Sequence, residues 1–314
     1  MKAPQTLPFL PLLLRRLCTV STWLPSARVP STRLSAALLK ATALELVVLT
    51  GHALLYPTGI TGERHATAGP PTGPAADTAG RAVPAPAPTA APEGTTALPG
   101  GGPERPPVVL LHGFIDNRSV FVLLRRSLAR HGWHHLESLN YSPLTCDIRT
   151  AAELLGRHIE EICARTGHRE VDIVGHSLGG LIARYYVQRL GGDRRVRTLV
   201  TLGTPHGGTA VAPLAGAHPI VRQMRSGSAP IEELRLPAPG CRTRFVSFWS
   251  ELDRVIVPVE AACIEHPDLD VVNVRVSGVG HLALPVHPAV ATGIRQALDA
   301  RAPAPGSADA ASVA

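Results

Sequence analysis

Short apolar runs alternate with longer helix-like segments from about residue 107 to residue 300. The runs that predict strands are PVVLLHG (107–113), VDIVGHS (171–177), RVRTLVTLGTP (195–205), TRFVSFWS (243–250) and VVNVRVSG (271–278). The segments with helical spacing are 118–132, 147–167 and 179–192. Continuous β-branched runs separated by helices are typical of a parallel sheet covered on both faces. The pattern therefore predicts an α/β fold, a doubly wound domain with a mainly parallel sheet.

One predicted helix carries clear signals at both ends. Asp147 stands just before the periodic stretch 151–162, where its carboxylate can accept hydrogen bonds from the first free amides of the helix. Gly167 follows the last turn, where a left-handed residue commonly ends a helix. We expect the helix to run between these two residues.

Segments rich in proline, glycine and alanine lie on both sides of this domain. Residues 57–105 contain almost no large apolar side chain after Ile60, and 301–314 repeat the same composition. Such segments cannot bury enough apolar surface to offset the entropy of ordering them. We therefore expect a disordered linker at 57–105, a folded α/β domain at 106–300 and a disordered tail at 301–314.

Residues 34–56 form a long apolar stretch that is interrupted by Lys40, Glu45 and His52. Central charges cost about 2.5 to 3.5 kcal/mol each on insertion scales, which brings the predicted insertion free energy close to zero. The excess of basic residues before the stretch fits the positive-inside pattern. We expect residues 1–56 to be an export signal or membrane anchor, with a helix packed on the domain as the alternative. The expected location is the cell envelope, with an exported catalytic domain, or the medium.

Charge and cysteine content exclude several classes of function. Of the charged segments, residues 1–56 contribute +5, and residues 105–300 contribute a dispersed +4 with no basic run, so nucleic acid is not an expected partner. The five cysteines show no CxxC or Cys/His spacing, so no metal and no cofactor is predicted. Cys241 and Cys263 flank a predicted strand, and the sequence leaves open whether they pair or remain free thiols.

A glycine-flanked serine lies between a predicted strand and a predicted helix. Gly175, His176, Ser177 and Gly179 lie in the sequence GHSLGG, which follows the strand VDIV directly. A strained strand-to-helix turn of this kind exposes a serine hydroxyl at the sheet edge, and its glycines avoid collisions that a Cβ would cause. The motif predicts that Ser177 is a nucleophile.

A serine nucleophile needs a base, and the base needs an acid that orients it. Asp253 follows the run 243–250, and His281 follows the run 271–278, in the chain order that this fold uses. Glu251 is the rival acid and His287 the rival base. We expect Ser177, Asp253 and His281 to form the catalytic triad.

Two backbone amides are candidates for an oxyanion hole. Leu178 follows the nucleophile, and Phe114 follows the first strand of the domain in LLHGF. His112 and Gly113 would shape the loop that carries Phe114, the histidine by hydrogen bonding and the glycine by allowing close backbone approach.

These motifs make the chain from about 107 to 300 resemble the bacterial lipase and esterase family of the α/β-hydrolase superfamily. The matching segments are PVVLLHGF, VDIVGHSLGG, LVTLGTPHGGT, SELDRVIV and VSGVGHLAL. The resemblance is greatest to small, nearly lidless triacylglycerol lipases, and it implies a minimal six-stranded sheet with the triad and oxyanion hole named above. The stretch at 209–242 is longer than in the smallest members of that family, so the sequence does not predict whether the protein has a working lid.

The expected activity is hydrolysis of carboxylic lipid esters through an acyl-enzyme on Ser177, by a lipase or carboxylesterase. An acyltransferase with the same triad is the alternative, followed by a catalytically silent binding protein. A lipid or small ester is the expected substrate, and membrane association is compatible with residues 34–56. The apolar residues expected to line an acyl pocket are Phe114, Ile115, Leu178, Leu282 and Leu284. The oligomeric state is not predicted.

Overall fold

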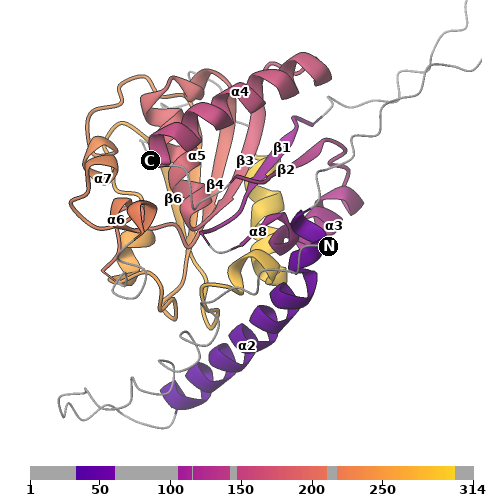
Figure 1. Ribbon diagram of the computed structural model, residues 1–314, viewed down its shortest axis with the longest axis vertical. Helices are drawn as coiled ribbons and strands as arrows, with labels where there is room; N and C mark the ends of the chain where they lie inside the picture. Colours follow the sequence, from indigo (N-terminus) through magenta and orange to yellow (C-terminus); the bar gives the residue numbers. More distant parts are fainter. Residues whose placement is uncertain (1–32, 61–104, 115, 142–146, 211–217, 301–314) are drawn as a thin grey trace, which may run out of the picture.

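The computed structural model describes residues 33–60, 105–114, 116–141, 147–210 and 218–300 (Figure 1). Its centre is a six-stranded sheet in the order β2-β1-β3-β4-β5-β6, and every neighbouring pair is parallel. The strands are β1 (Val108–Leu111), β2 (Leu136–Leu139), β3 (Val171–His176), β4 (Val196–Leu202), β5 (Arg244–Trp249) and β6 (Asp270–Arg275). The predicted six-stranded, doubly wound architecture is confirmed.

Helices occupy both faces of this sheet and the loops at its ends. The α-helices are α2 (Arg33–Ile60), α3 (Val122–Arg130), α4 (Ile148–Thr166), α5 (Leu178–Arg189), α6 (Pro219–Gln223), α7 (Ala229–Glu233) and α8 (Pro288–Asp299). The 3-10 helices are η2 (Arg118–Phe121), η3 (Gly192–Arg194), η4 (Val259–Ala262) and η5 (Leu284–Val286). Most of the predicted linker and all of the predicted tail lie outside the described residues.

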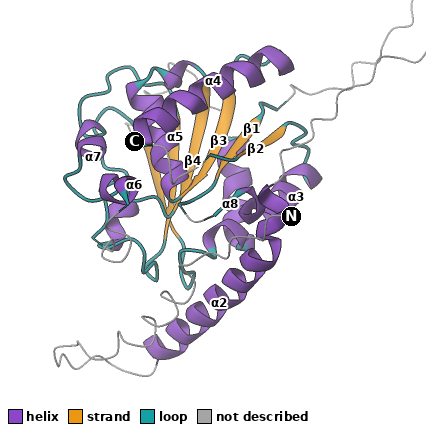
Figure 2. Cartoon of the chain, in the orientation of Figure 1, coloured by secondary structure: helices purple, strands orange, loops and turns teal. Residues whose placement is uncertain are grey.

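Alternate residues of each central strand enter two separate cores. In β1, Val109 and Leu111 join the core under α4 and α5, whereas Val108 and Leu110 join the core under α3 and α8. All four side chains are buried, because both faces of the sheet are covered (Figure 2). This double coverage explains why the strands appear in the sequence as continuous apolar runs.

The predicted ends of α4 are confirmed. The Asp147 side chain accepts a hydrogen bond from the Thr150 amide at 2.7 Å, and Gly167 adopts a left-handed conformation with φ 74°. A carboxylate at the N-cap also interacts favourably with the positive end of the helix dipole.

Strand β2 was not predicted from the sequence. Leu136–Leu139 has the sequence LESL, and only Ser138 in it is buried. The strand lies at the edge of the sheet, and two polar residues interrupt the apolar run that would have predicted it. The short helices α6 and α7 lie in the stretch 209–242, most of which the structure describes as helices, turns and loops.

Helix α2 packs against the domain (Figure 1). Ala41 and Val48 are buried, and Leu44 and Val48 contact the core that α3 and α8 cover. Among the helices of the described segments, none combines the length and the hydropathy that a membrane span requires.

The described cysteines, Cys163, Cys241 and Cys263, are all free thiols. The disulfide that the sequence left open between Cys241 and Cys263 is therefore not formed in this structure.

A buried ion pair ties the sheet to the last helix. Arg197 donates to Asp172 at 3.0 and 2.5 Å and to the Leu298 carbonyl at 2.7 Å. Asp172 is fully buried, and burial raises its pKa to about 6 even though Arg197 and Thr198 oppose that shift. The carboxylate thus depends on Arg197 to remain ionised at neutral pH.

Replacement of Arg197 by methionine should lower the free energy of unfolding by about 3 kcal/mol at pH 8, because it leaves a buried carboxylate without its partner. The folded pKa of Asp172 already lies above its unfolded value, and this change raises it further. Protonation of Asp172 therefore removes part of the cost of the unpaired buried charge, and the loss of unfolding free energy should be smaller at pH 5. Urea unfolding at both pH values measures this.

Arg195→Met is the matched control, because Arg195 pairs with Glu160 at the exposed surface at 2.7 and 2.8 Å. Such a pair contributes about 1 kcal/mol or less. Equal losses in the two variants, or a loss that does not change with pH, would contradict the assigned role of Asp172.

Candidate active site

Ser177 occupies a sharp turn between β3 and α5. Its φ of 52° and ψ of −119° make it the one non-glycine residue with positive φ in the described part of the chain. Such a conformation costs about 1 to 3 kcal/mol and persists only where its surroundings hold it. The Ser177 amide donates to Leu202, and the Ser177 carbonyl accepts from the Gly180 amide and the Thr204 hydroxyl.

The glycines around Ser177 are required by close backbone approach. A Cβ on Gly175 would lie 2.7 Å from the Gly180 Cα, and one on Gly179 would lie 2.6 Å from the His112 carbonyl oxygen. Both distances are shorter than real Cβ contacts allow. The GHSLGG sequence is thus what permits α5 to start directly against β1 and β3.

Asp253 and His281 form a buried pair at the carboxyl ends of β5 and β6. His281 Nδ1 lies 2.7 Å from Asp253 Oδ2. The other carboxylate oxygen, Oδ1, accepts from the amides of Val255 and Ile256 at 2.8 and 3.0 Å. With Nδ1 donating to the carboxylate, Nε2 of the neutral imidazole is left as the proton acceptor.

Charge and burial shift the pKa values of Asp253 and His281 in opposite directions. Burial on its own lowers the pKa of His281, but the charge and hydrogen bond of Asp253 outweigh it, so the pKa is raised above its ordinary value. Burial likewise favours the neutral form of Asp253, but His281 and the two amides lower the pKa of its carboxyl. The pair therefore combines an ionised carboxylate with a basic imidazole.

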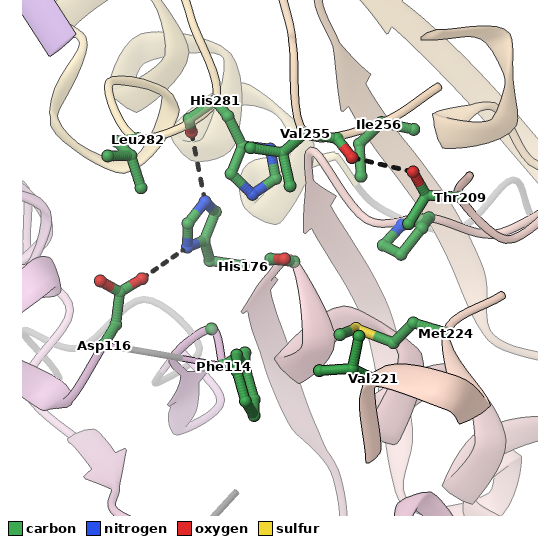
Figure 3. A pocket seen from close by; sticks show the side chains of 13 residues that line it. Phe114, Asp116, His176, Thr209, Val221, Met224, Val255, Ile256, His281 and Leu282 are labelled. Carbon is green, nitrogen blue, oxygen red and sulfur yellow. Dashed lines mark hydrogen bonds and ion pairs between the residues drawn. The ribbon is translucent and has the colours of Figure 1, made fainter. Parts of the chain in front are cut away.

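Ser177 and His281 line one cavity of about 170 Å³. Within the described segments, no hydrogen bond joins the Ser177 side chain to His281; catalytic hydrogen bonds are often long before substrate binds. The other residues that line this cavity are Gly113, Phe114, Asp116, His176, Pro205, Thr209, Val221, Met224, Val255, Ile256 and Leu282 (Figure 3). Most are apolar, so the cavity suits an apolar group.

Two further polar residues in this cavity, Asp116 and His176, are linked to the backbone of His281. His176 Nδ1 lies 3.2 Å from Asp116 Oδ2, and His176 Nε2 lies 3.2 Å from the His281 carbonyl oxygen (Figure 3). The His176 ring thus lies between the Asp116 carboxylate and the His281 carbonyl oxygen and links the two. A Cβ on Gly113 would lie 3.0 Å from Asp116 Oδ2, so glycine makes room for this pair.

The role of Asp116 was not predicted from the sequence. It stands two residues after Phe114 in HGFIDN, and an acid so close to the oxyanion loop was the available signal. His176 was assigned only a supporting place in the motif.

The loop that carries Asp253 is tied down by buried hydroxyls. Thr209 Oγ1 donates to the Val255 carbonyl at 2.8 Å and accepts from the Val257 amide at 3.0 Å. Ser250 Oγ donates to the Val279 carbonyl, which links the Asp253 loop to the His281 loop. These contacts restrict both loops to one relative position.

The two candidate oxyanion amides are both without a protein acceptor in the described part of the chain. Leu178 begins α5, where a free amide is expected, and Phe114 follows β1. His112 shapes the loop as expected: its Nδ1 contacts the Gly113 carbonyl at 2.8 Å, and its ring stacks on Tyr141 at 4.4 Å.

The rival residues have other roles. Glu251 pairs with Arg275 at 3.4 Å near the surface, and His287 stands at the start of α8. Of the apolar residues predicted to line an acyl pocket, Phe114 and Leu282 do so. The prediction was wrong for Leu178 and Leu284, which are buried in the two cores of the sheet, and Ile115 lies outside the described residues. No group of three or more His, Cys, Asp or Glu in the described segments is arranged to hold a metal ion.

A family model matches the part of the chain that carries Ser177 and the Phe114 loop, but not Asp253 or His281. The family model described as palmitoyl protein thioesterase matches residues 107–235. A triacylglycerol lipase from Pseudarthrobacter phenanthrenivorans is 30% identical over 116 residues, which are 34% of this chain and 35% of that lipase. A triacylglycerol lipase from Burkholderia plantarii is also 30% identical over 116 residues, 34% of this chain and 32% of its own length. The chain thus matches about a third of the length of these curated relatives.

A solved structure shares the fold at low identity. The mature form of the Bacillus licheniformis lipase BlEst2 has a TM-score of 0.54 at 17% identity, over 63% of this chain and 93% of its own. This likeness, together with the six-stranded parallel sheet, shows that the chain has an α/β-hydrolase fold.

The coupling of Asp253 to His281 predicts how the imidazole titrates. By nuclear magnetic resonance, the pKa of His281 should lie above 6.5 in the native chain. In Asp253→Asn it should fall, because the change removes the charge that raises the pKa and leaves the burial that lowers it.

Glu251→Gln is the matched control, since it changes the rival acid two residues away. It should leave the His281 titration unchanged. A His281 pKa that responds to Glu251→Gln and not to Asp253→Asn would show that the wrong acid had been assigned.

Proposed function

We propose that this chain is a serine hydrolase that cleaves carboxylic esters through an acyl-enzyme on Ser177. The observation that carries the proposal is the buried Asp253–His281 pair, which shares one apolar cavity with a serine on a strained turn. Serine-dependent ester hydrolysis uses these three groups as nucleophile, base and orienting acid.

The reaction begins when His281 Nε2 takes the proton of the Ser177 hydroxyl while Oγ bonds to the ester carbonyl carbon. The carbonyl oxygen becomes an oxyanion, which the Phe114 and Leu178 amides stabilise. His281 then gives the proton to the leaving alkoxide, and the C–O bond breaks to leave the acyl group on Ser177. Water repeats the sequence: His281 takes its proton, its oxygen attacks the acyl carbon, and Ser177 leaves with the proton restored.

The cavity supports an apolar acyl chain as the substrate group. Phe114, Val221, Met224 and Leu282 line it, and the matched relatives are named as triacylglycerol lipases. A lipid or other apolar carboxylic ester is therefore the proposed substrate class.

Thioester hydrolysis is a second candidate that one observation favours. The matching family model is described as palmitoyl protein thioesterase, and its match includes Ser177 and the Phe114 loop. Attack by a serine oxygen on a thioester uses the same groups and releases a thiol in place of an alcohol. Acyl transfer to an alcohol remains the alternative that differs only in the second acceptor.

A lipid surface is the proposed partner. The outward side of α2 carries apolar residues at helical spacing that are 51% to 75% exposed: Leu39, Leu46, Val47 and Leu54. An apolar helix face of this kind inserts into the interfacial region of a bilayer. Attachment at the cell envelope, with the catalytic domain exported, is the proposed location.

Ser177→Ala should abolish hydrolysis of p-nitrophenyl esters and of the matched thioester, and Asp253→Asn should lower kcat by about 10⁴-fold, as expected when the imidazole loses its orienting acid. Acyl chains of two to eighteen carbons, offered as ester and as thioester, define the preferred substrate. Circular dichroism confirms that the variants are folded. Wild-type turnover by folded Ser177→Ala would disprove the proposal.

Membrane attachment predicts that the full-length chain sediments with vesicles of phosphatidylethanolamine and phosphatidylglycerol. Replacing both Leu46 and Val47 by glutamine should release most of the bound protein, because it removes half of the exposed apolar set. Leu123→Gln is the control, since Leu123 is an equally exposed leucine on α3. Equal binding by all forms would refute attachment through α2.

A further inference from the structure

Glu45 of α2 reaches the loop that carries His281. Its Oε1 accepts a hydrogen bond of 2.7 Å from the Leu282 amide, although 237 residues separate the two in the chain. Ala41 and Val48, which lie on the same side of α2, are buried. The carboxylate therefore faces the domain from a helix side that is otherwise apolar.

The residue on the other side of His281 is shaped to receive this carboxylate. A Cβ on Gly280 would lie 2.5 Å from Glu45 Cδ and 2.7 Å from Glu45 Cγ. Those separations are too short for any real side chain, so glycine leaves the space that Glu45 fills. The side chain thus contacts both neighbours of His281 along the chain.

We propose that Glu45 is a positioning residue for His281 and that α2 belongs to the catalytic unit. The catalytic consequence rests on the proposed function, whereas the positioning itself does not. A carboxylate bonded to a backbone amide is a charge-assisted hydrogen bond, which is stronger than a neutral one. This hydrogen bond fixes the backbone of Leu282, and it therefore restricts the position of the neighbouring His281 Cα, from which the imidazole extends.

Glu45 is one of three residues that restrain His281 and its neighbouring backbone. Asp253 holds Nδ1 of His281, His176 holds its carbonyl oxygen, and Glu45 holds the amide of the next residue. These partners come from the loop after β5, the end of β3 and helix α2. Without Glu45, the Leu282 amide would lose the hydrogen bond that ties the chain after His281 to α2.

The charges that face His281 are Asp253 and Asp116, Glu45, and His176, which is itself paired with Asp116. Glu45 contributes to the raised pKa of His281, after Asp253. A substitution that keeps the hydrogen bond and removes the charge should therefore lower the pKa of His281.

The test compares Glu45→Gln, Glu45→Ala and Gly280→Ala in the full-length chain. Glutamine keeps an acceptor oxygen without the charge, alanine removes both, and Gly280→Ala displaces an intact carboxylate. Thr50→Ala is the control on the same helix, because Thr50 is exposed and its hydroxyl donates to the Leu46 carbonyl of α2, and Glu153→Gln repeats the chemical change on the exposed side of α4. The readouts are Leu282 amide exchange, the His281 titration, and kcat and KM on a short ester.

Glu45→Ala and Gly280→Ala should speed Leu282 amide exchange and lower kcat by about ten- to a hundredfold, with KM changed less than about twofold, as expected for a misplaced base. Glu45→Gln should keep slow exchange and a kcat near the native value, with the acid limb of activity shifted to lower pH. Both control variants should behave as the native chain.

Unchanged exchange and kcat in Glu45→Ala would overturn the proposal, and so would an equal loss in Thr50→Ala, which would indicate general helix packing. Loss of protection in Glu45→Gln as large as in Glu45→Ala would also overturn it. If the native chain hydrolyses neither esters nor thioesters, the proposed function fails, and amide exchange with the His281 titration still decides whether Glu45 positions the loop.

Discussion

The left-handed conformation of Ser177 is the constraint on which the site depends. A residue with a side chain adopts φ near 50° only where packing holds it, and here both strand and helix do so. Glycine at 175 and 179 allows α5 to start against β1 and β3, and the Thr204 hydroxyl holds the Ser177 carbonyl. Because the turn is held from several sides, the hydroxyl is presented at the sheet edge and the Leu178 amide is left free. The parallel sheet then supplies the rest of the site at the same edge.

The remaining groups come from loops that are each tied to a neighbour. Thr209 and the amides after Asp253 restrain the acid loop, and Ser250 joins it to the loop of the histidine. The buried Asp253 carboxylate remains ionised because its hydrogen bonds offset its burial. The same balance leaves His281 more basic than a free imidazole. A site built from such linked loops can hold its geometry before a substrate arrives.

Helix α2 adds a segment from outside the α/β domain to the proposed functional unit. In the sequence, Glu45 is a charge that interrupts an apolar stretch and weakens its prediction as a membrane span. In the structure, that charge has a specific place, because it accepts the Leu282 amide in a space that Gly280 leaves open. The helix thus presents an apolar outward side and one inward carboxylate. These features connect the proposed lipid surface with the proposed base through one element.

By itself the sequence determined five strands of the sheet, the ends of α4, the glycine-flanked turn at Ser177 and the pairing of Asp253 with His281. These features depend on local spacing and on the rule that parallel strands end at one edge, so neighbouring residues suffice to predict them. Strand β2 could not be predicted, since LESL is short and contains no β-branched residue, whereas the edge strand β6 is marked by its valines. Only the tertiary structure decided that Asp116 meets His176 and that Glu45 meets Leu282, because these partners lie 60 and 237 residues apart and no local pattern records such contacts. It also decided which apolar residues face the cavity, since Leu178 and Leu284 carry the same chemistry as Leu282 and differ from it only in where the fold directs them.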